Sequence, residues 1–439
     1  MNLTKYFTYA KEKGFSDIEF KTQRKSKLSI QVFHSKVEQY QVAENDTLYI
    51  RGIVNGKMVA GTTENFSNVE KILDEMAENA SIIEEVKEQE IFGGSEKYEE
   101  LKTHNDVLAN TSSTQKVNLC LQAEKKAFEY DSKVADVGEV SYEEVESAMT
   151  IVNSKGLNLS YKVSYAMLVV EVVAKENNDT RTGFAYQFGQ SLDAFNVDAL
   201  VKKACDDAIK ALNGTQCESN KYKVLFNQST FSSFVGILMN AVNGDNVNKG
   251  KSLLKDKLNE AIASEKFTLV ENPHVEKYPF FFRGFDDEGV ATYKKPIVEK
   301  GVLKTFLYNI EAAKQAKTNS TGNGYGGSVI GISPAFLQVE LGSKSFDELC
   351  KTINYGVYIT GVQGLHAGMN PLSGDFSLQA SGYMIEDGKV TTPINLITVA
   401  GNLFEMFKNI EEVGNDEFLT YSGVCSPSVY IKELAISGK

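Results

Sequence analysis

The sequence predicts an α+β protein with two domains, an N-terminal one of antiparallel sheets with helices and a C-terminal one of mainly antiparallel β-structure with flanking helices. Segments of period-two hydrophobicity follow one another with short turns between them, which favours antiparallel pairing of neighbouring strands. The chain has 439 residues, and a single core rarely grows past roughly 250–300 residues. We therefore expect domains at 1–215 and 216–439, with a linker near 84–105 in the first.

The N-terminal half begins with strands of alternating pattern. Asn55-Gly56 separates two apolar segments, and this dipeptide suits a hairpin turn because both of its residues must take positive φ. Ser67 and Glu70 form a capping-box pattern ahead of a periodic apolar stretch, which predicts a helix. A second set of strands is predicted within 134–186, and Asn196 is a suitable N-cap for the helix that closes this half.

The C-terminal half is organised around one apolar helix. Five apolar residues follow each other at helical spacing and predict a face that docks on a core: Phe231, Phe234, Val235, Leu238 and Val242. Short strands surround this helix in the sequence. Ser345 with Glu348 predicts a further short helix, since serine and glutamate three residues apart can cap each other's backbone.

The composition is that of an ordinary globular protein. No apolar run approaches the ~20 residues that cross a bilayer, and the first residues contain no hydrophobic targeting segment, so we expect a cytoplasmic protein without membrane contact. Five widely spaced cysteines fit free thiols in a reducing compartment. A net charge of −12 disfavours binding to phosphate backbones, so no nucleic-acid partner is expected.

Several sequence strings resemble those of the TldD/PmbA family, whose members are classed as peptidase U62 and also labelled modulators of DNA gyrase. The resemblance covers nearly the whole chain and rests on five strings in family order: Phe285-Asp-Asp-Glu-Gly289, Glu299-Lys-Gly-Val-Leu-Lys304, Ser320-Thr-Gly-Asn-Gly324, Asn370-Pro-Leu-Ser-Gly-Asp-Phe376 and Ala400-Gly-Asn-Leu403. Five such strings are far more specific than any one of them.

The zinc motif of the TldD branch is absent from the apolar helix. In that branch the helix carries His-Glu-x-x-x-His, followed by a segment similar to Gly250-Lys251-Ser252. Counting back from this segment, the motif positions fall on Val235, Gly236 and Asn240. None of these can ligate zinc as histidine does or act as a base as glutamate does. The chain therefore resembles the PmbA branch, also called TldE, which lacks the zinc motif.

This resemblance implies a subunit that pairs with a zinc-bearing TldD-like subunit and encloses a chamber in which unfolded or small peptides are cleaved. The family also implies peptide maturation and antitoxin degradation. No cofactor is then expected in this chain, zinc is expected in the partner, and the isolated chain could be a homodimer. Two alternatives remain: a free-standing homodimeric peptidase with an unrecognised site, and a non-enzymatic regulatory or binding protein.

Other candidate residues have plainer interpretations. His366, in a glycine-flanked loop, is the best single histidine candidate, but we expect a surface side chain. Cys425 lies closer to Pro427 than a zinc ligand of the TldD branch would, so no such role is assigned. The successive acids Asp286, Asp287 and Glu288 are expected in an exposed turn.

Two segments are candidates for binding a peptide or a partner. Gly322, Gly324 and Gly327 satisfy G-x-G-x-x-G, but no helix follows them, so dinucleotide binding is not expected. We expect instead that Gly322, Asn323 and Gly324 allow a close approach by another backbone, from this chain or from a bound peptide.

The second candidate segment combines a carboxylate, an aromatic ring and small residues at the start of a strand: Asp375, Phe376, Ser377, Ser381 and Gly382. Capture of an extended peptide by strand addition would use such residues. A turn packed into the domain explains them equally well, so both interpretations stay open.

Overall fold

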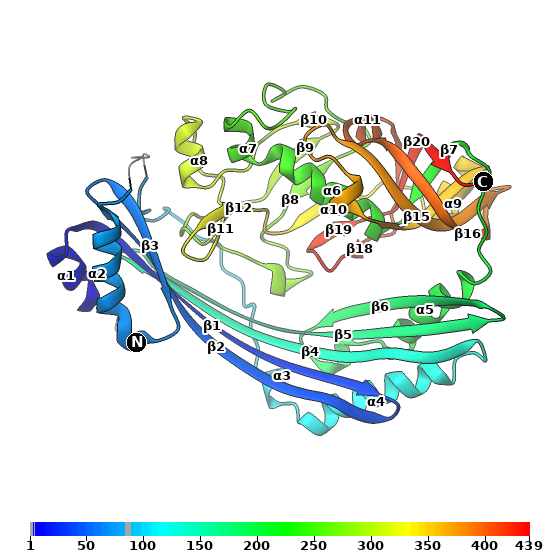
Figure 1. The fold of residues 1–439 in the computed structure, drawn as a ribbon, viewed down its shortest axis with the longest axis horizontal. Helices are drawn as coiled ribbons and strands as arrows, with labels where there is room; N and C mark the ends of the chain where they lie inside the picture. The colour runs from blue at the N-terminus through cyan, green and yellow to red at the C-terminus, as the bar shows by residue number, and fades with distance from the viewer. Residues whose placement is uncertain (1–2, 4, 84–88) are drawn as a thin grey trace. The chain divides into compact units, whose positions relative to one another are not determined.

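A computed structural model describes residues 3, 5–83 and 89–439 (Figure 1). The chain divides into two compact units, each described separately below. Unit 1 comprises 1–96, 100–213 and 326–329, and unit 2 comprises 97–99, 214–325 and 330–439. Part of the predicted linker, residues 84–88, lies outside the described residues. Within the part of the chain that the structure describes, no helix is both long and apolar enough to cross a lipid bilayer.

Unit 1 contains one sheet and several helices. Its strands are β1 (Phe15–Phe33), β2 (Lys36–Val54), β3 (Lys57–Thr63), β4 (Val134–Asn153), β5 (Asn158–Glu176) and β6 (Asp179–Gly189). Its helices are α1 (Lys5–Glu12), α2 (Val69–Asn79), α3 (Val107–Asn110), α4 (Ser113–Phe128) and α5 (Val197–Lys210), with short 3-10 turns at Phe66–Asn68 and Leu192–Ala194.

The sheet of unit 1 is fully antiparallel, in the order β3-β2-β1-β4-β5-β6. β1 pairs with β4 from Glu19↔Asn153 to Val32↔Val140, so the two strand sets predicted from the sequence join into one sheet. Asn55 and Gly56 connect β2 to β3 with φ values of 51° and 74°, which confirms the predicted hairpin.

Two helices of unit 1, α4 and α5, pack on the sheet largely through small and aliphatic side chains. α4 and α5 share one face of it (Figure 1), where Cys120, Ala123 and Ala204 meet inward residues of β4 and β5. Asn196 caps α5 as predicted, accepting a hydrogen bond from Ala199 N. The Ser67–Glu70 capping box is wrong: a 3-10 turn capped by Asn65 precedes α2, and the Ser67 hydroxyl donates to Asn65 Oδ1 at 2.7 Å.

Unit 2 is built from shorter elements. Its strands are β7 (Asn220–Phe226), β8 (Leu269–Glu271), β9 (Lys295–Glu299), β10 (Val302–Leu303), β11 (Gly324–Gly326), β12 (Ile330–Ile332), β13 (Leu337–Val339), β14 (Gly356–Gln363), β15 (Asp375–Glu386), β16 (Lys389–Asn402), β17 (Ile410–Val413), β18 (Phe418–Leu419), β19 (Val424–Ser426) and β20 (Val429–Ser437). Its helices are α6 (Gln228–Val242), α7 (Gly244–Asn248), α8 (Ile310–Gln315), α9 (Phe346–Ile353), α10 (Leu365–Gly368) and α11 (Leu403–Lys408), with a 3-10 turn at Pro279–Phe281.

The larger sheet of unit 2 closes on itself. Its order is β16-β15-β14-β7-β20-β17, and β16 also pairs with β20 through Thr398↔Ser437, Val399↔Ile436 and Ala400↔Ala435. A second sheet has the order β10-β9-β8-β13-β19-β18. Pairing is mainly antiparallel, as predicted, but β14–β7 and β13–β19 are parallel. The α+β prediction is confirmed.

α6 lies at the centre of unit 2 (Figure 1). Asn227 caps it by accepting a hydrogen bond from Thr230 N. All five residues of the predicted apolar face are buried, as the spacing indicated. Phe234 contacts the rings of Phe226 and Phe376, each at 5.3 Å between centroids, so the helix ties β7 and β15 into one core.

Candidate functional site

The solvent-facing side of α6 carries little chemistry. Val235 is fully buried in the core of unit 2, whereas Gly236 and Asn240 are exposed. No heavy atom lies within 4 Å of the place where a β-carbon on Gly236 would be. A valine, a glycine and an amide offer neither a metal ligand of the usual kind nor a general base.

The other residues that the structure describes do not bring together a metal site either. Across residues 3, 5–83 and 89–439, no three side chains of His, Cys, Asp or Glu come together in a way that could hold a metal ion. A catalytic zinc needs three protein ligands of this kind. The described residues therefore do not fit a zinc ion, at α6 or elsewhere.

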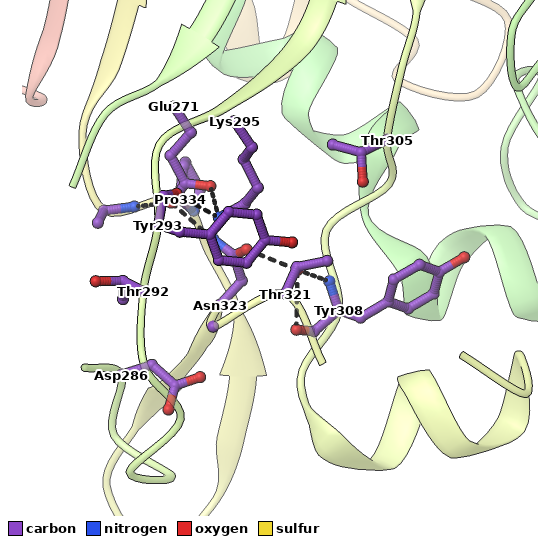
Figure 2. A network of polar contacts seen from close by, with 12 residues as sticks. Glu271, Asp286, Thr292, Tyr293, Lys295, Thr305, Tyr308, Thr321, Asn323 and Pro334 are labelled. Carbon is purple, nitrogen blue, oxygen red and sulfur yellow. Dashed lines mark hydrogen bonds and ion pairs between the residues drawn. The ribbon is translucent and has the colours of Figure 1, made fainter. Parts of the chain in front are cut away.

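A polar cluster of unit 2 is buried against the glycine-rich loop, the segment that contains Gly322, Asn323 and Gly324. Figure 2 shows Glu271 of β8, Lys295 of β9 and Asn323 pointing toward one another. Lys295 Nζ lies 2.9 Å from Glu271 Oε2, and Asn323 Nδ2 donates to Glu271 Oε1 at 2.8 Å. The two charged side chains are 5% and 0% exposed. Since the pair is buried away from solvent, the attraction between the two charges is little screened.

The same loop is anchored a second time by its neighbours. Thr321 Oγ1 donates to Asn323 Oδ1 at 2.7 Å and accepts from Tyr308 N at 2.7 Å. Asn323 Nδ2 also donates to the carbonyl of Ser333 at 2.9 Å. Every polar atom of the Asn323 side chain is therefore engaged within this chain.

The acidic turn is not exposed as predicted: Asp286 and Glu288 are buried, and only Asp287 is partly exposed. Asp286 accepts backbone hydrogen bonds from Gly324 N at 2.8 Å and from Glu288 N and Val290 N at 3.0 Å. Burial raises the pKa of Asp286 well above its ordinary value, and the nearby Glu288 carboxylate raises it further, against these donors. The turn is thus an internal clamp on the glycine-rich loop.

The glycine-rich loop packs against this chain. Gly322, Asn323 and Gly324 are all buried. A β-carbon on Gly322 would lie 2.9 Å from the carbonyl oxygen of Ala291, so the backbone that approaches this glycine belongs to the protein itself. The sequence left open whether the approaching backbone comes from this chain or from a bound peptide, and the structure contains the contact within this chain.

The residues of the second candidate segment lie along β15 on alternating faces. Asp375, Ser377 and Ser381 are exposed, whereas Phe376 and Gly382 are buried. Gly382 pairs with Ile359 of β14 and with Ile394 of β16, so both backbone edges are occupied there. Strand addition at Gly382 is therefore excluded in this structure, whereas the exposed side chains of β15 remain accessible.

Asp375 is fixed at the start of β15. Asn402 Nδ2 and Ser373 Oγ each donate to its carboxylate at 2.8 Å, and they lower the pKa of Asp375. His366 is exposed on α10, as expected. Cys425 is buried in β19, where burial and the hydrogen bond that its thiol donates to Glu417 raise its pKa well above the ordinary value. A thiol in that state is a poor nucleophile.

Models of three consecutive domains match the chain. They are described as PmbA/TldA metallopeptidase domain 1, central domain and C-terminal domain, and they match residues 22–81, 106–212 and 219–438. The chain therefore belongs to the PmbA/TldD family.

Relatives in the PmbA/TldD family agree with this assignment. The chain is 28% identical to "Metalloprotease PmbA" of Escherichia coli O157:H7 over 75% of its own length and 71% of that protein. A crystal structure of a putative modulator of a DNA gyrase from Thermotoga maritima is 30% identical, with a TM-score of 0.91 and 99% of each chain covered. TldE from Thermococcus kodakarensis has a TM-score of 0.90 over 99% of this chain and 100% of its own, and its 23% identity makes it evidence of the fold alone.

Glu271 and Lys295, the charged centre of the buried cluster, were not among the site residues predicted from the sequence. Each is a charged residue at the end of a short apolar strand segment, Leu269–Glu271 and Lys295–Val298. A charge in a strand buried on both faces needs a partner of opposite sign, so the sequence could have indicated that each residue has one. Which residues pair could not be predicted, because this depends on the register between β8 and β9.

Proposed function

We propose that this chain is the PmbA/TldE-like, non-zinc subunit of a metallopeptidase complex, and that a TldD-like zinc-bearing subunit is its partner. The substrates would be unfolded or small peptides, which by family resemblance include precursors that mature by cleavage and labile antitoxins. Hydrolysis would take place at the partner's zinc site. This chain would contribute the walls of the chamber and the contacts between subunits.

The observation that carries this proposal is the composition of α6. The positions counted for the family's zinc motif hold Val235, Gly236 and Asn240, and Val235 is locked into the core by full burial. A ligand at position 235 would have to enter that core, and burying a polar group there without a partner costs about 1–3 kcal/mol. The packing of α6 thus opposes a zinc site in this subunit.

In this proposal, the exposed residues of β15 are the ones that would contact the substrate. Asp375, Ser377 and Ser381 would contact peptide or partner through their side chains, because the backbone of the strand is already paired around Gly382. All five cysteines are buried free thiols. This suits a reducing compartment such as the cytoplasm.

The test is a reconstitution. The purified chain, a TldD-like subunit from the same host and their mixture are each incubated with an unfolded peptide, and cleavage is followed by mass spectrometry. The proposal predicts cleavage by the mixture well above the sum of the separate proteins. Metal analysis of this chain alone is expected to give far less than one zinc per molecule.

A matched control uses a partner variant whose own general base has been removed. The mixture containing that variant should lose the added activity, since this chain cannot replace the base. Stoichiometric zinc or peptide cleavage by this chain alone would instead favour a free-standing peptidase. No gain on mixing would favour a regulatory or binding protein.

A further inference from the structure

The outer part of β2 has an edge that pairs with no strand among the described residues. β3 covers β2 only from Leu48↔Thr63 to Val54↔Lys57, whereas β1 runs beside β2 along its other side. Every residue from Lys36 to Asn45 is exposed. Along this stretch β2 is the border of the sheet of unit 1 (Figure 1).

A bulge limits the regular part of this edge. Gln31 of β1 pairs with Gln39, but the next residue, Val32, pairs with Val37, so Glu38 is an extra residue in β2. Bulges of this kind interrupt further pairing at a sheet edge. The segment that could accept a strand therefore begins at Gln39 and runs toward Glu44, beyond the bulge.

The two faces of this segment differ in chemistry. Tyr40, Val42 and Glu44 point to the face of the sheet that carries α4. Tyr40 pairs with Ile30 of β1, which packs in the same core as α4, and every second residue of β2 shares the face of Tyr40. Tyr40 is 47% and Val42 58% exposed, which is unusual for large apolar side chains on a strand edge. The other face presents Gln39, Gln41 and Ala43.

The far end of the segment is acidic. Glu44 is exposed, and a second carboxylate lies next to the following residue, since Glu64 Oε1 accepts a hydrogen bond from Asn45 Nδ2 at 3.1 Å. Arg24 is already bound by both carboxylate oxygens of Asp46 at 2.7 Å. A second copy of this chain, which carries a net charge of −12, would bring the same carboxylates to the same edge. An extended segment with a basic residue would neutralise them.

We propose that the edge Gln39–Glu44 of β2 binds an extended polypeptide segment by antiparallel strand addition, with a basic residue opposite Glu44 and apolar residues opposite Val42 and Tyr40. Read in the peptide's own direction, the preferred pattern is basic-x-apolar-x-apolar, because paired side chains in antiparallel strands share a face. The inference concerns unit 1 alone and does not depend on the proposed peptidase complex.

The test uses the full chain and the labelled peptide Thr-Lys-Thr-Val-Thr-Val-Thr, with binding followed by fluorescence anisotropy. A peptide with Glu in place of Lys should bind at least about tenfold more weakly, which corresponds to ~1.4 kcal/mol. Glu44→Lys should reverse this preference. Glu44 is exposed, so the variant is expected to fold, and circular dichroism checks this.

Two further peptides separate strand addition from simple charge attraction. They carry backbone N-methyl groups at alternate residues, either the odd or the even positions, and have equal charge. An added strand bonds through one edge only, so one pattern should abolish binding and the other should preserve most of it. Equal binding of both, no effect of Glu44→Lys, or self-association of the chain through Val42, detected by disulfide cross-linking of Val42→Cys, would overturn the proposal.

Discussion

The main sheets of the two units differ in their edges: one is open and the other is closed. In unit 1 the sheet stays open, with β3 and β6 at its borders, and one edge of the outer part of β2 meets no strand among the described residues. In unit 2 the pairing of β16 with β20 closes the larger sheet on itself. An open edge exposes backbone donors and acceptors that another chain can use, whereas a closed sheet has none to offer there. Binding through the backbone is thus a property to seek in unit 1, and binding through side chains along the closed part of the larger sheet of unit 2.

The largest expected difference concerns enclosed against open charge pairs. Lys295→Met in unit 2 would leave Glu271 buried without its cation, and such losses cost about 3–5 kcal/mol. The matched variant Lys27→Met in unit 1 removes a pair with Glu143, 2.6 Å apart and 37% and 31% exposed, which should cost less than ~1 kcal/mol. Urea unfolding followed by fluorescence measures both. Equal losses of unfolding free energy in the two variants would mean that burial of the ion pair does not determine its contribution to stability.

A smaller difference is expected when one methyl group is added between strands. A β-carbon on Gly382 would lie 1.9 Å from the carbonyl oxygen of Tyr358 in the neighbouring strand β14, so Gly382→Ala should destabilise unit 2 by about 1–3 kcal/mol. On Gly138 of β4 the nearest atom is the flexible Glu171 Oε1 at 3.1 Å. Gly138→Ala should therefore change stability by less than ~1 kcal/mol. Thermal unfolding compares the two variants. An unchanged melting temperature for Gly382→Ala would show that β14 and β15 can move apart at little cost.

The smallest effects are expected in the dependence of stability on pH, and they have opposite signs in the two units. In unit 1, partial burial alone would raise the pKa of Asp206, but hydrogen bonds from Lys202, Tyr130 and Lys210 lower it far below its ordinary value. Because unfolded Asp titrates near ~3.9, this stabilisation is present above that pH and is lost as pH falls toward the lowered pKa. The advantage of the native chain over Asp206→Asn should shrink below about pH 4.

For Asp286 in unit 2 the sign is reversed. Its raised pKa means that the folded state holds a proton which the unfolded state has released, so stability falls as pH rises above about 4 toward the raised value. The stability of the native chain relative to Asp286→Asn should therefore decline with rising pH. Urea midpoints measured from pH 3 to 8 follow both variants. Parallel profiles for the two substitutions would contradict the contrast between the units.

Most local features of the fold were predictable from the sequence, with the Ser67–Glu70 capping box as an exception, and distant pairings were not. The Asn55-Gly56 turn, the apolar face of α6 and the capping box of Ser345 with Glu348 each depend on neighbours within a few residues, and all are present. The pairing of β1 with β4 joins segments more than one hundred residues apart, and no local pattern indicates it. The same holds for the closure of the sheet in unit 2.

The candidate site shows the same limit. That the motif positions on α6 lack ligands could be seen in the sequence alone, since it depends only on residue type. The burial of Asp286 could not, because the donor that reaches its carboxylate, Gly324 N, comes from 38 residues away. Contiguous acids predict an exposed turn unless such distant donors are known. The role of the glycine-rich loop as a packed internal element was hidden for the same reason.

The closure of the larger sheet also affects how the protein is made. β7 ends at Phe226, yet the strand that pairs with it on one side, β20, starts only at Val429. While the ribosome adds the residues between them, β7 cannot complete its pairing, and contacts so distant in sequence form slowly. A nascent chain would meanwhile expose the apolar side chains of α6 and β7, which makes synthesis of unit 2 a stage at which chaperones should bind.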